Sequence, residues 1–189
     1  VVAALKRNTI FDRLAMGFAV LGYAMPYFFM GVLLILLFSL QLRWLPSSGS
    51  STWWHLIMPV LTLGTTPAAM FARFTRSSVL EVMNKPFIRT VRAKGALPWR
   101  EIVFHALPNA AIPVVTVIAL GIPSIFGGAI ITEQVFKVNG IGQLLITAIQ
   151  ANDIPMVQTI TFIFAVLIVV FNLIADVLYG VLDPRIRYD

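Results

Sequence analysis

The sequence predicts an all-α integral membrane protein, a polytopic helical bundle with four transmembrane helices and both ends in the cytoplasm. Of its 189 residues, 59% are hydrophobic and only 12% are charged, whereas soluble domains are about half apolar and a quarter charged. The charges are also segregated, so that they separate four long uncharged runs. This composition excludes a disordered chain, which needs low hydrophobicity, and argues against an ordinary soluble enzyme.

The four uncharged runs predict the spans. A helix rises about 1.5 Å per residue and needs about 20 apolar residues to cross a hydrocarbon core of about 30 Å. The runs are continuous rather than alternating, which argues against membrane strands. The second run reaches this length only if its helix continues past Ala72 while Arg73 and Arg76 extend towards the headgroups. The expected spans cover residues of about 14–42, 56–80, 109–132 and 154–176.

The Lys and Arg residues predict the orientation of the spans. Twelve of the 14 lie at the two ends and in residues 73–101, and only Arg43 and Lys137 lie in the other two loops. Cytoplasmic loops carry the basic excess, so both ends and residues 73–101 are expected inside and residues 133–153 outside. The net charge of +6 is mostly this bias, and the basic residues lack the context of a nucleic-acid-binding motif.

Prolines interrupt three of the predicted spans, at Pro26, Pro67 and Pro123, with glycines nearby. One interpretation is a set of kinked, closely packed helices around a gated path. The other is that membrane helices simply contain more Gly and Pro than soluble ones. The sequence leaves both open.

Residues 81–108, named the basic loop below, are longer than helix connections of about 2–8 residues. Glu81 and Lys85 have the spacing of a helical ion pair, and Pro86 ends that helix. We expect a short helix at 87–94, followed by a turn at Gly95 with positive φ.

A second short helix is expected at 98–107, with Pro98 in its first turn. Leu107 and Pro108 would close it, and Asn109 would cap the next span. A helical wheel divides its residues between an apolar side, with Trp99, Ile102, Val103 and Ala106, and a polar side, with Arg100, Glu101 and His105. A rigid, two-faced pair of helices indicates a docking platform for a cytoplasmic partner.

No catalytic, cofactor or metal site is expected in this chain. There is no cysteine, the two histidines lack partners at metal-ligand spacing, and no Gly-rich loop with Lys and Ser or Thr offers a phosphate site. A proton-coupled carrier normally keeps a carboxylate or His inside the membrane, and the predicted spans contain neither deep inside. The chain is therefore expected to have no catalytic site of its own.

Gly95, followed after nine residues by His105-Ala106-Leu107-Pro108, resembles the G-x9-I-x-L-P part of the EAA loop of ABC importer permeases. The stretch RTVRAKGALPWREIVFHALPNAAIPVVTV, the LPSSGS segment up to Gly64 and the closing ADVLYGVLDPRIRY resemble the dipeptide/oligopeptide/nickel branch. Thr90-Val91-Arg92 stands where the general motif has Glu-Ala-Ala, and His105 stands in place of Ile.

The resemblance implies the C-terminal portion of a B-type permease subunit, with the last four of six type I importer spans, in a bacterial inner membrane. It implies a single permease domain, 1–189, without its own ATPase site. Its partners would be a second permease subunit, two ATP-binding subunits that hold ATP and Mg²⁺, and an external solute-binding protein. A heterodimer of permease chains is favoured, but the sequence leaves a homodimer open. The residues expected to couple to the ATPases are Arg92, Lys94, Gly95, Trp99, Arg100, Glu101, His105, Leu107 and Pro108.

Two other classes stay open. A secondary transporter would place its ligands at broken helices near the membrane midplane, and a non-transporting assembly subunit would need no Pro or Gly at matching depths. The external segment 133–153 is expected to contain an amphipathic helix that lies in the interface or touches the binding protein. The sequence does not distinguish peptides, glutathione and nickel chelates as substrates.

Overall fold

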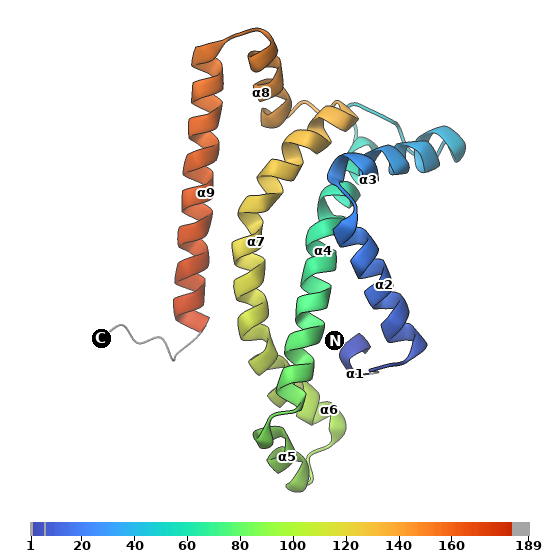
Figure 1. Cartoon of the computed structure of the whole chain (residues 1–189), viewed down its shortest axis with the longest axis vertical. Coiled ribbons are helices and arrows are strands. Elements are labelled where there is room, and N and C mark those ends of the chain that lie inside the picture. The colour runs from blue at the N-terminus through green and yellow to red at the C-terminus, as the bar shows by residue number, and fades with distance from the viewer. Residues whose placement is uncertain (1, 6, 183–189) are drawn as a thin grey trace. The chain divides into compact units, whose positions relative to one another are not determined.

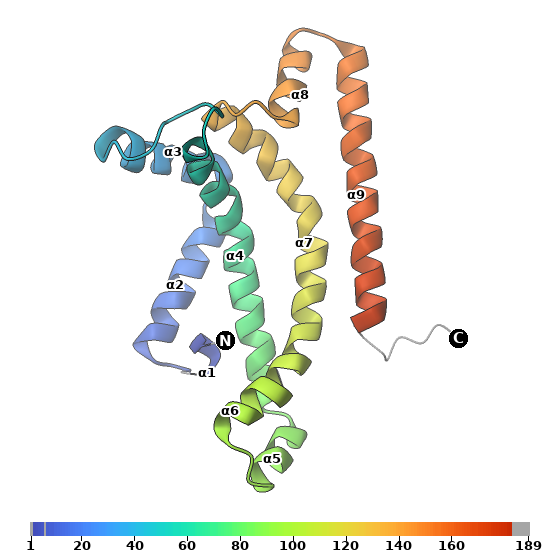
Figure 2. The same cartoon turned by 180° about the vertical axis from the view of Figure 1, so that it is seen from behind.

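The computed structural model describes residues 2–5 and 7–182, and all regular secondary structure in this part of the chain is helical (Figures 1 and 2). The predicted all-α class is confirmed. Three basic residues of the orientation argument, Lys6, Arg185 and Arg187, lie outside the described residues. In chain order the helices are α1 (Val2–Leu5), α2 (Ile10–Ala24), α3 (Tyr27–Leu34), η1 (Ile35–Gln41), α4 (Trp54–Met83), α5 (Pro86–Ala93), α6 (Pro98–Arg100), η2 (Glu101–Ala106), α7 (Leu107–Phe136), α8 (Ile141–Gln150) and α9 (Ile154–Leu182).

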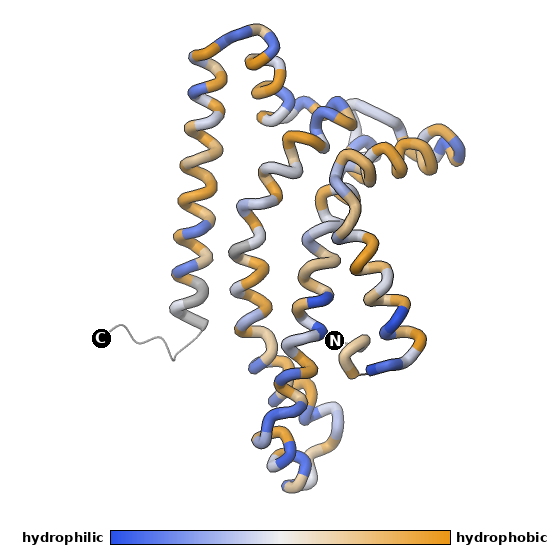
Figure 3. The backbone as a smooth tube through the Cα atoms, viewed as in Figure 1, coloured by the Kyte–Doolittle hydropathy of each residue, from blue (hydrophilic) through white to orange (hydrophobic). Residues whose placement is uncertain are grey.

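Three stretches of helix within the described residues are long and apolar enough to cross a membrane, namely Trp54–Met83, Pro98–Ala119 and Ile154–Val177. Apolar residues run along α4, α7 and α9, whereas hydrophilic ones gather around α5 (Figure 3). The predicted spans 56–80 and 154–176 fall inside α4 and α9, and 109–132 falls inside α7.

The first predicted span, 14–42, is not one straight helix. α2 ends at Ala24, Pro26 has an extended backbone with φ −61° and ψ 147°, and α3 begins at Tyr27. The helices on the two sides of this break are bent by 109°, so they form either one broken span or a re-entrant segment. Pro26 therefore interrupts the helix outright, because proline lacks the N–H of the helical ladder. Pro67, in contrast, lies inside the continuous helix α4.

The chain divides into two compact units. The unit made of Gly22–Pro67 and Gly121–Leu173 packs α3 against α7 through glycines. A Cβ at Gly128 would lie 2.8 Å from the Tyr27 ring, and one at Gly31 would lie 3.1 Å from Val135. Small residues allow such close approach between membrane helices, where no hydrophobic effect drives association.

The same unit holds the predicted amphipathic helix of the external segment, which is α8. The Glu133 side chain, near the end of α7, accepts a hydrogen bond from the Gln143 backbone N–H at 2.9 Å. A carboxylate near a helix N-terminus stabilises it, because the exposed N–H groups carry partial positive charge. A Cβ at Gly142 would lie 2.6 Å from the backbone Cα of Ile130, and one at Gly140 would displace the Glu133 carboxylate, so the connection depends on small residues at both positions.

The other unit contains the part of the chain up to Leu21, Ala68–Leu120 and the end of α9 from Ile174. Its hydrophobic core brings together α1, the end of α4, α5, η2 and the start of α7. The buried residues are Ala4, Val79, Val82, Ile88, Ala106 and Ala110. This core lies directly under the basic loop.

Candidate functional site

The first half of the basic loop forms the helix that its sequence predicts. Lys85 has an extended backbone before Pro86, which occupies the first turn of α5, where its missing N–H is no loss. Lys85 also makes the expected ion pair with Glu81, at 3.4 Å, between two exposed side chains. Ile88 is fully buried in the core and anchors α5 to the end of α4.

Gly95 makes the predicted turn. Its φ is +82°, in the region that favours glycine. The Gly95 N–H donates to the Arg92 carbonyl at 3.0 Å, and the Ala96 N–H donates to the Val91 carbonyl at 3.4 Å. The second of these bonds resembles that of a Schellman motif, which satisfies carbonyls at the end of a helix.

The second half of the loop corrects the prediction of a closed short helix. α6 begins at Pro98 and continues through the π-helix η2 into α7 without a break, so Leu107 and Pro108 do not end an element. Pro108 has no N–H, so it cannot bond the Phe104 carbonyl, and the wider π turn just before it accommodates this loss. Asn109 caps nothing; its side-chain Nδ2 donates to the His105 carbonyl at 2.8 Å.

The predicted division of this segment into an apolar and a polar side holds only in part, because Glu101 of the polar side is buried. Glu101 and Ala106 are the buried residues, whereas Trp99, Val103 and Phe104 are about half exposed. In an α-helix, with about 3.6 residues per turn, residues five apart point about 140° away from each other. The i→i+5 bonding of η2 instead brings residues five apart together. The Trp99 and Phe104 rings, also five apart, have centroids at 5.9 Å.

An ion pair joins the two halves of the loop. The Arg92 Nη2 donates to the Glu101 Oε1 at 2.6 Å, and its Nε donates to Oε2 at 3.1 Å. Such a two-pronged contact fixes orientation as well as distance. The Glu101 side chain is 5% exposed. This contact, and then the attraction of the carboxylate charge, raises the pKa of Arg92. α5 is thereby held against η2.

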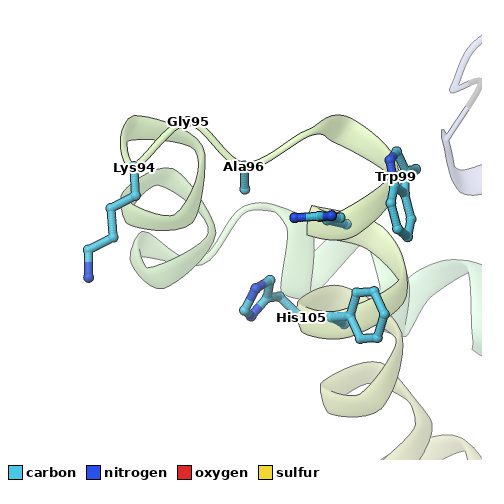
Figure 4. Close-up of a pocket in the computed structure, with 7 residues that line it drawn as sticks. Lys94, Gly95, Ala96, Trp99 and His105 are labelled. Atoms are coloured by element: carbon cyan, nitrogen blue, oxygen red, sulfur yellow. The ribbon is translucent and has the colours of Figure 1, made fainter.

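A cavity of about 540 Å³ opens on the loop. The His105 ring extends into the space below the Gly95–Ala96 turn, whereas Lys94 extends away from that space (Figure 4). The Arg100 guanidinium lies 5.2 Å from the centroid of the Trp99 ring, within the range of a cation–π contact. The cavity is lined by Lys94, Gly95, Ala96, Trp99, Arg100, Phe104 and His105.

The structure thus brings five of the nine predicted coupling residues together around this cavity. Arg92 and Glu101 line a second, smaller cavity of about 250 Å³. Leu107 packs against the core, and Pro108 is exposed at the start of α7. The loop therefore gathers one arginine, a histidine and two aromatic rings at this cavity, whereas Lys94 borders the cavity and extends away from it.

Sequence reasoning missed an ion pair next to the loop. Arg76 was expected to extend to the headgroups, but it contacts Asp12 of α2 at 2.7 Å, and its side chain is only 24% exposed. The sequence signal at Thr9 and Asp12, which have the spacing of a capping box, concerns only the start of α2 and not the pairing with Arg76. The Asp12 N–H does donate to the Thr9 Oγ1, at 3.4 Å.

No group of three or more His, Cys, Asp or Glu side chains within the described residues could hold a metal ion. The predicted absence of catalytic, metal and cofactor sites stays a prediction.

A helical chain with three or four candidate spans and a basic two-helix loop defines a polytopic membrane protein with a surface suited to a soluble partner. The family described as "Binding-protein-dependent transport system inner membrane component" matches residues 1–188, and the chain belongs to this family. The membership confirms the resemblance seen in the sequence and the predicted inner-membrane location.

Two relatives illustrate the similarity. The glutathione transport system permease protein GsiC of Escherichia coli (strain K12) is 43% identical over 188 residues, which cover 100% of this chain and 61% of that protein. The di/tripeptide transport system permease protein DppB of Pseudomonas aeruginosa (strain UCBPP-PA14) is 41% identical over 216 residues, which cover 100% of this chain and 64% of that protein. The chain spans less than two thirds of the length of either relative.

Proposed function

We propose that the chain is part of the transmembrane permease subunit of an ATP-driven importer. It would form half of a translocation path together with a second permease chain, and an external binding protein would deliver the solute. Two ATP-binding subunits would hold ATP and Mg²⁺ and would dock on the basic loop. The chain itself would hydrolyse no ATP.

The observation that carries this proposal is the cavity on the basic loop. Arg100 and His105 offer positive charge or hydrogen-bond donors, and Trp99 and Phe104 offer ring surfaces. Interfaces are enriched in Arg and aromatic residues of this kind. The occupant that fits is an acidic, partly apolar surface segment of an ATPase subunit. The names of the relatives support the same general function.

We further propose small peptides as the substrate class. One relative is named for glutathione and the other for di- and tripeptides, and both names describe small peptide-like solutes. An ABC importer receives its cargo from a binding protein, so the external segment around α8 is the expected side of delivery.

Co-purification tests the docking surface. The full-length permease is solubilised with its partner subunits, and the recovered ATPase is quantified for Arg100→Glu and for Arg89→Glu. Both changes reverse one positive charge, but only Arg100 lines the cavity. We expect Arg100→Glu to lose most of the ATPase and Arg89→Glu to retain more. Equal recovery would show that the cavity is not the docking site, and a parent permease that recovers no ATPase would contradict the proposed function.

A further inference from the structure

The ion pair between Asp12 of α2 and Arg76 of α4 fixes the geometry of the two helices more tightly than packing alone would. The Arg76 Nε donates to the Asp12 Oδ1 and the Arg76 Nη2 donates to the Asp12 Oδ2, both at 2.7 Å. The planar fork of arginine matches a carboxylate in this way, which lysine cannot do. The Asp12 side chain is only 4% exposed, so its carboxylate is shielded from water, whereas the Arg76 side chain is 24% exposed.

Asp12 also fixes the chain that leads into α2. Its Oδ2 accepts a third hydrogen bond, from the Asn8 backbone N–H at 3.0 Å. Asn8 has a φ of +62°, so this bond holds a turn of left-handed backbone between α1 and α2. One carboxylate therefore ties together α4 and the turn before α2.

Arg76 is connected to the basic loop through α4 itself. Val79 and Val82 follow it by about one and two helical turns, and both are buried in the core that includes Ile88 of α5 and Ala4 of α1. α5 is in turn held to η2 by Arg92 and Glu101. These contacts form a continuous route from α5 to the part of α4 where Arg76 contacts Asp12.

A polar clamp has a specific use in this setting. Membrane helices gain little from apolar contact with each other, because the lipid is equally apolar, so apolar surfaces alone leave the sliding of one helix past another weakly restrained. An ion pair with a buried carboxylate fixes distance and orientation, and the loss of Arg76 would leave the buried charge of Asp12 unpaired. Such a clamp makes α2 follow α4.

We propose that Asp12 and Arg76 are positioning residues that transmit the movement of the basic loop to α2, so that ATP-driven motion reaches a third helix of the permease. The proposal rests on the proposed function and extends it beyond the loop. Neither residue is expected to touch the ATPase or the solute. Their loss should therefore separate ATP hydrolysis from uptake without releasing the ATPase.

The test uses the complete transporter in sealed vesicles, with a labelled dipeptide and labelled glutathione as probes. Uptake and ATP hydrolysis are measured in the same vesicles for Arg76→Lys, for the neutral pair D12N/R76Q and for the exchanged pair D12R/R76D. We expect uptake per ATP to fall about 5- to 150-fold in the neutral pair, the span of ordinary coupling between sites. Arg76→Lys keeps the positive charge but loses the two-pronged contact, so its uptake per ATP should fall less. The exchanged pair D12R/R76D should have a higher uptake per ATP than the neutral pair.

The matched control is Arg13→Gln, which removes an exposed arginine of α2 next to Asp12 but leaves the Asp12–Arg76 pair in place. It should keep the parental ratio. If the neutral pair does not insert, Arg76→Lys decides the question alone. Variants that recruit the ATPase and keep the parental uptake per ATP overturn the clamp proposal by itself. A parent complex that recruits no ATPase overturns the proposed function as well.

Discussion

Two glycines of this chain are required for different physical reasons. At Gly95 a Cβ would meet no heavy atom within 4 Å, but the φ of +82° is strained for any other residue. At Gly128 the backbone is helical, and the constraint is the Tyr27 ring, 2.8 Å from where a Cβ would stand. The first glycine therefore serves the turn of the basic loop, and the second serves helix packing.

Gly95→Val should uncouple the transporter, because a bulky residue with positive φ costs about 1–2 kcal/mol or more and the turn would open. Uptake and ATP hydrolysis in vesicles measure the effect: hydrolysis should persist while uptake falls. Gly95→Asn is the matched control, since asparagine tolerates the left-handed region and open space surrounds this position. Full uptake by the valine variant would contradict a role for this turn.

At the scale of elements, the basic loop is an assembly of α5 and the α6–η2 segment rather than two independent helices. Ile88 and Ala106 are both fully buried in the shared core, and Arg92 holds Glu101 above them. Burial of these apolar side chains holds α5 and the α6–η2 segment together, whereas the ion pair fixes the angle between them.

Glu101→Gln should loosen α5 while leaving the spans intact. The amide accepts hydrogen bonds but carries no charge, so the contact with Arg92 weakens. Hydrogen exchange in detergent measures it: amides of α5 should exchange several-fold faster, with α4 and α9 unchanged. The exchanged pair R92E/E101R should restore slow exchange. Unaltered exchange in α5 would mean that the core alone holds the helix.

The sequence predicted where these helices and turns lie better than it predicted which of their side chains are buried. Pro86, Gly95 and Pro98 predicted the start of α5, the turn and the start of α6, because the effect of proline or glycine on the backbone is local. The π-helix was not predicted, because a helical wheel assumes one period, and Glu101 was therefore grouped on the polar side with Arg100 and His105. The pairing of Asp12 with Arg76 depends on tertiary packing between residues 64 positions apart, which local patterns do not report.

At the scale of the whole molecule, the distribution of Lys and Arg predicts the orientation of the spans in the membrane, whereas the fold is the same in either orientation. The described helices supply three or four candidate spans, and only the distribution of Lys and Arg says which loops face the cytoplasm. Because the sequence contains no cysteine, single cysteines can serve as reporters of side.

A cysteine at Arg89 and one at Lys137 should react from opposite sides of the membrane, in a full-length background freed of other cysteines. In intact cells a membrane-impermeant maleimide should label the Lys137→Cys variant, whereas Arg89→Cys should react only after the membrane is permeabilised. Labelling of both positions in intact cells would refute the predicted orientation, and with it the cytoplasmic docking of the basic loop.

The π-helix η2 has a consequence for which side of the loop a partner meets. A π turn holds one residue more than an α turn, so η2 acts as a one-residue insertion within an otherwise continuous helix. Removing that residue would restore α-helical phase and rotate Trp99 and Arg100 by about 100° relative to α7. The sequence would change by only one residue, yet the side chains of Trp99 and Arg100 would point in another direction. Backbone phase, as much as side-chain identity, thus decides which partner surface the loop can fit.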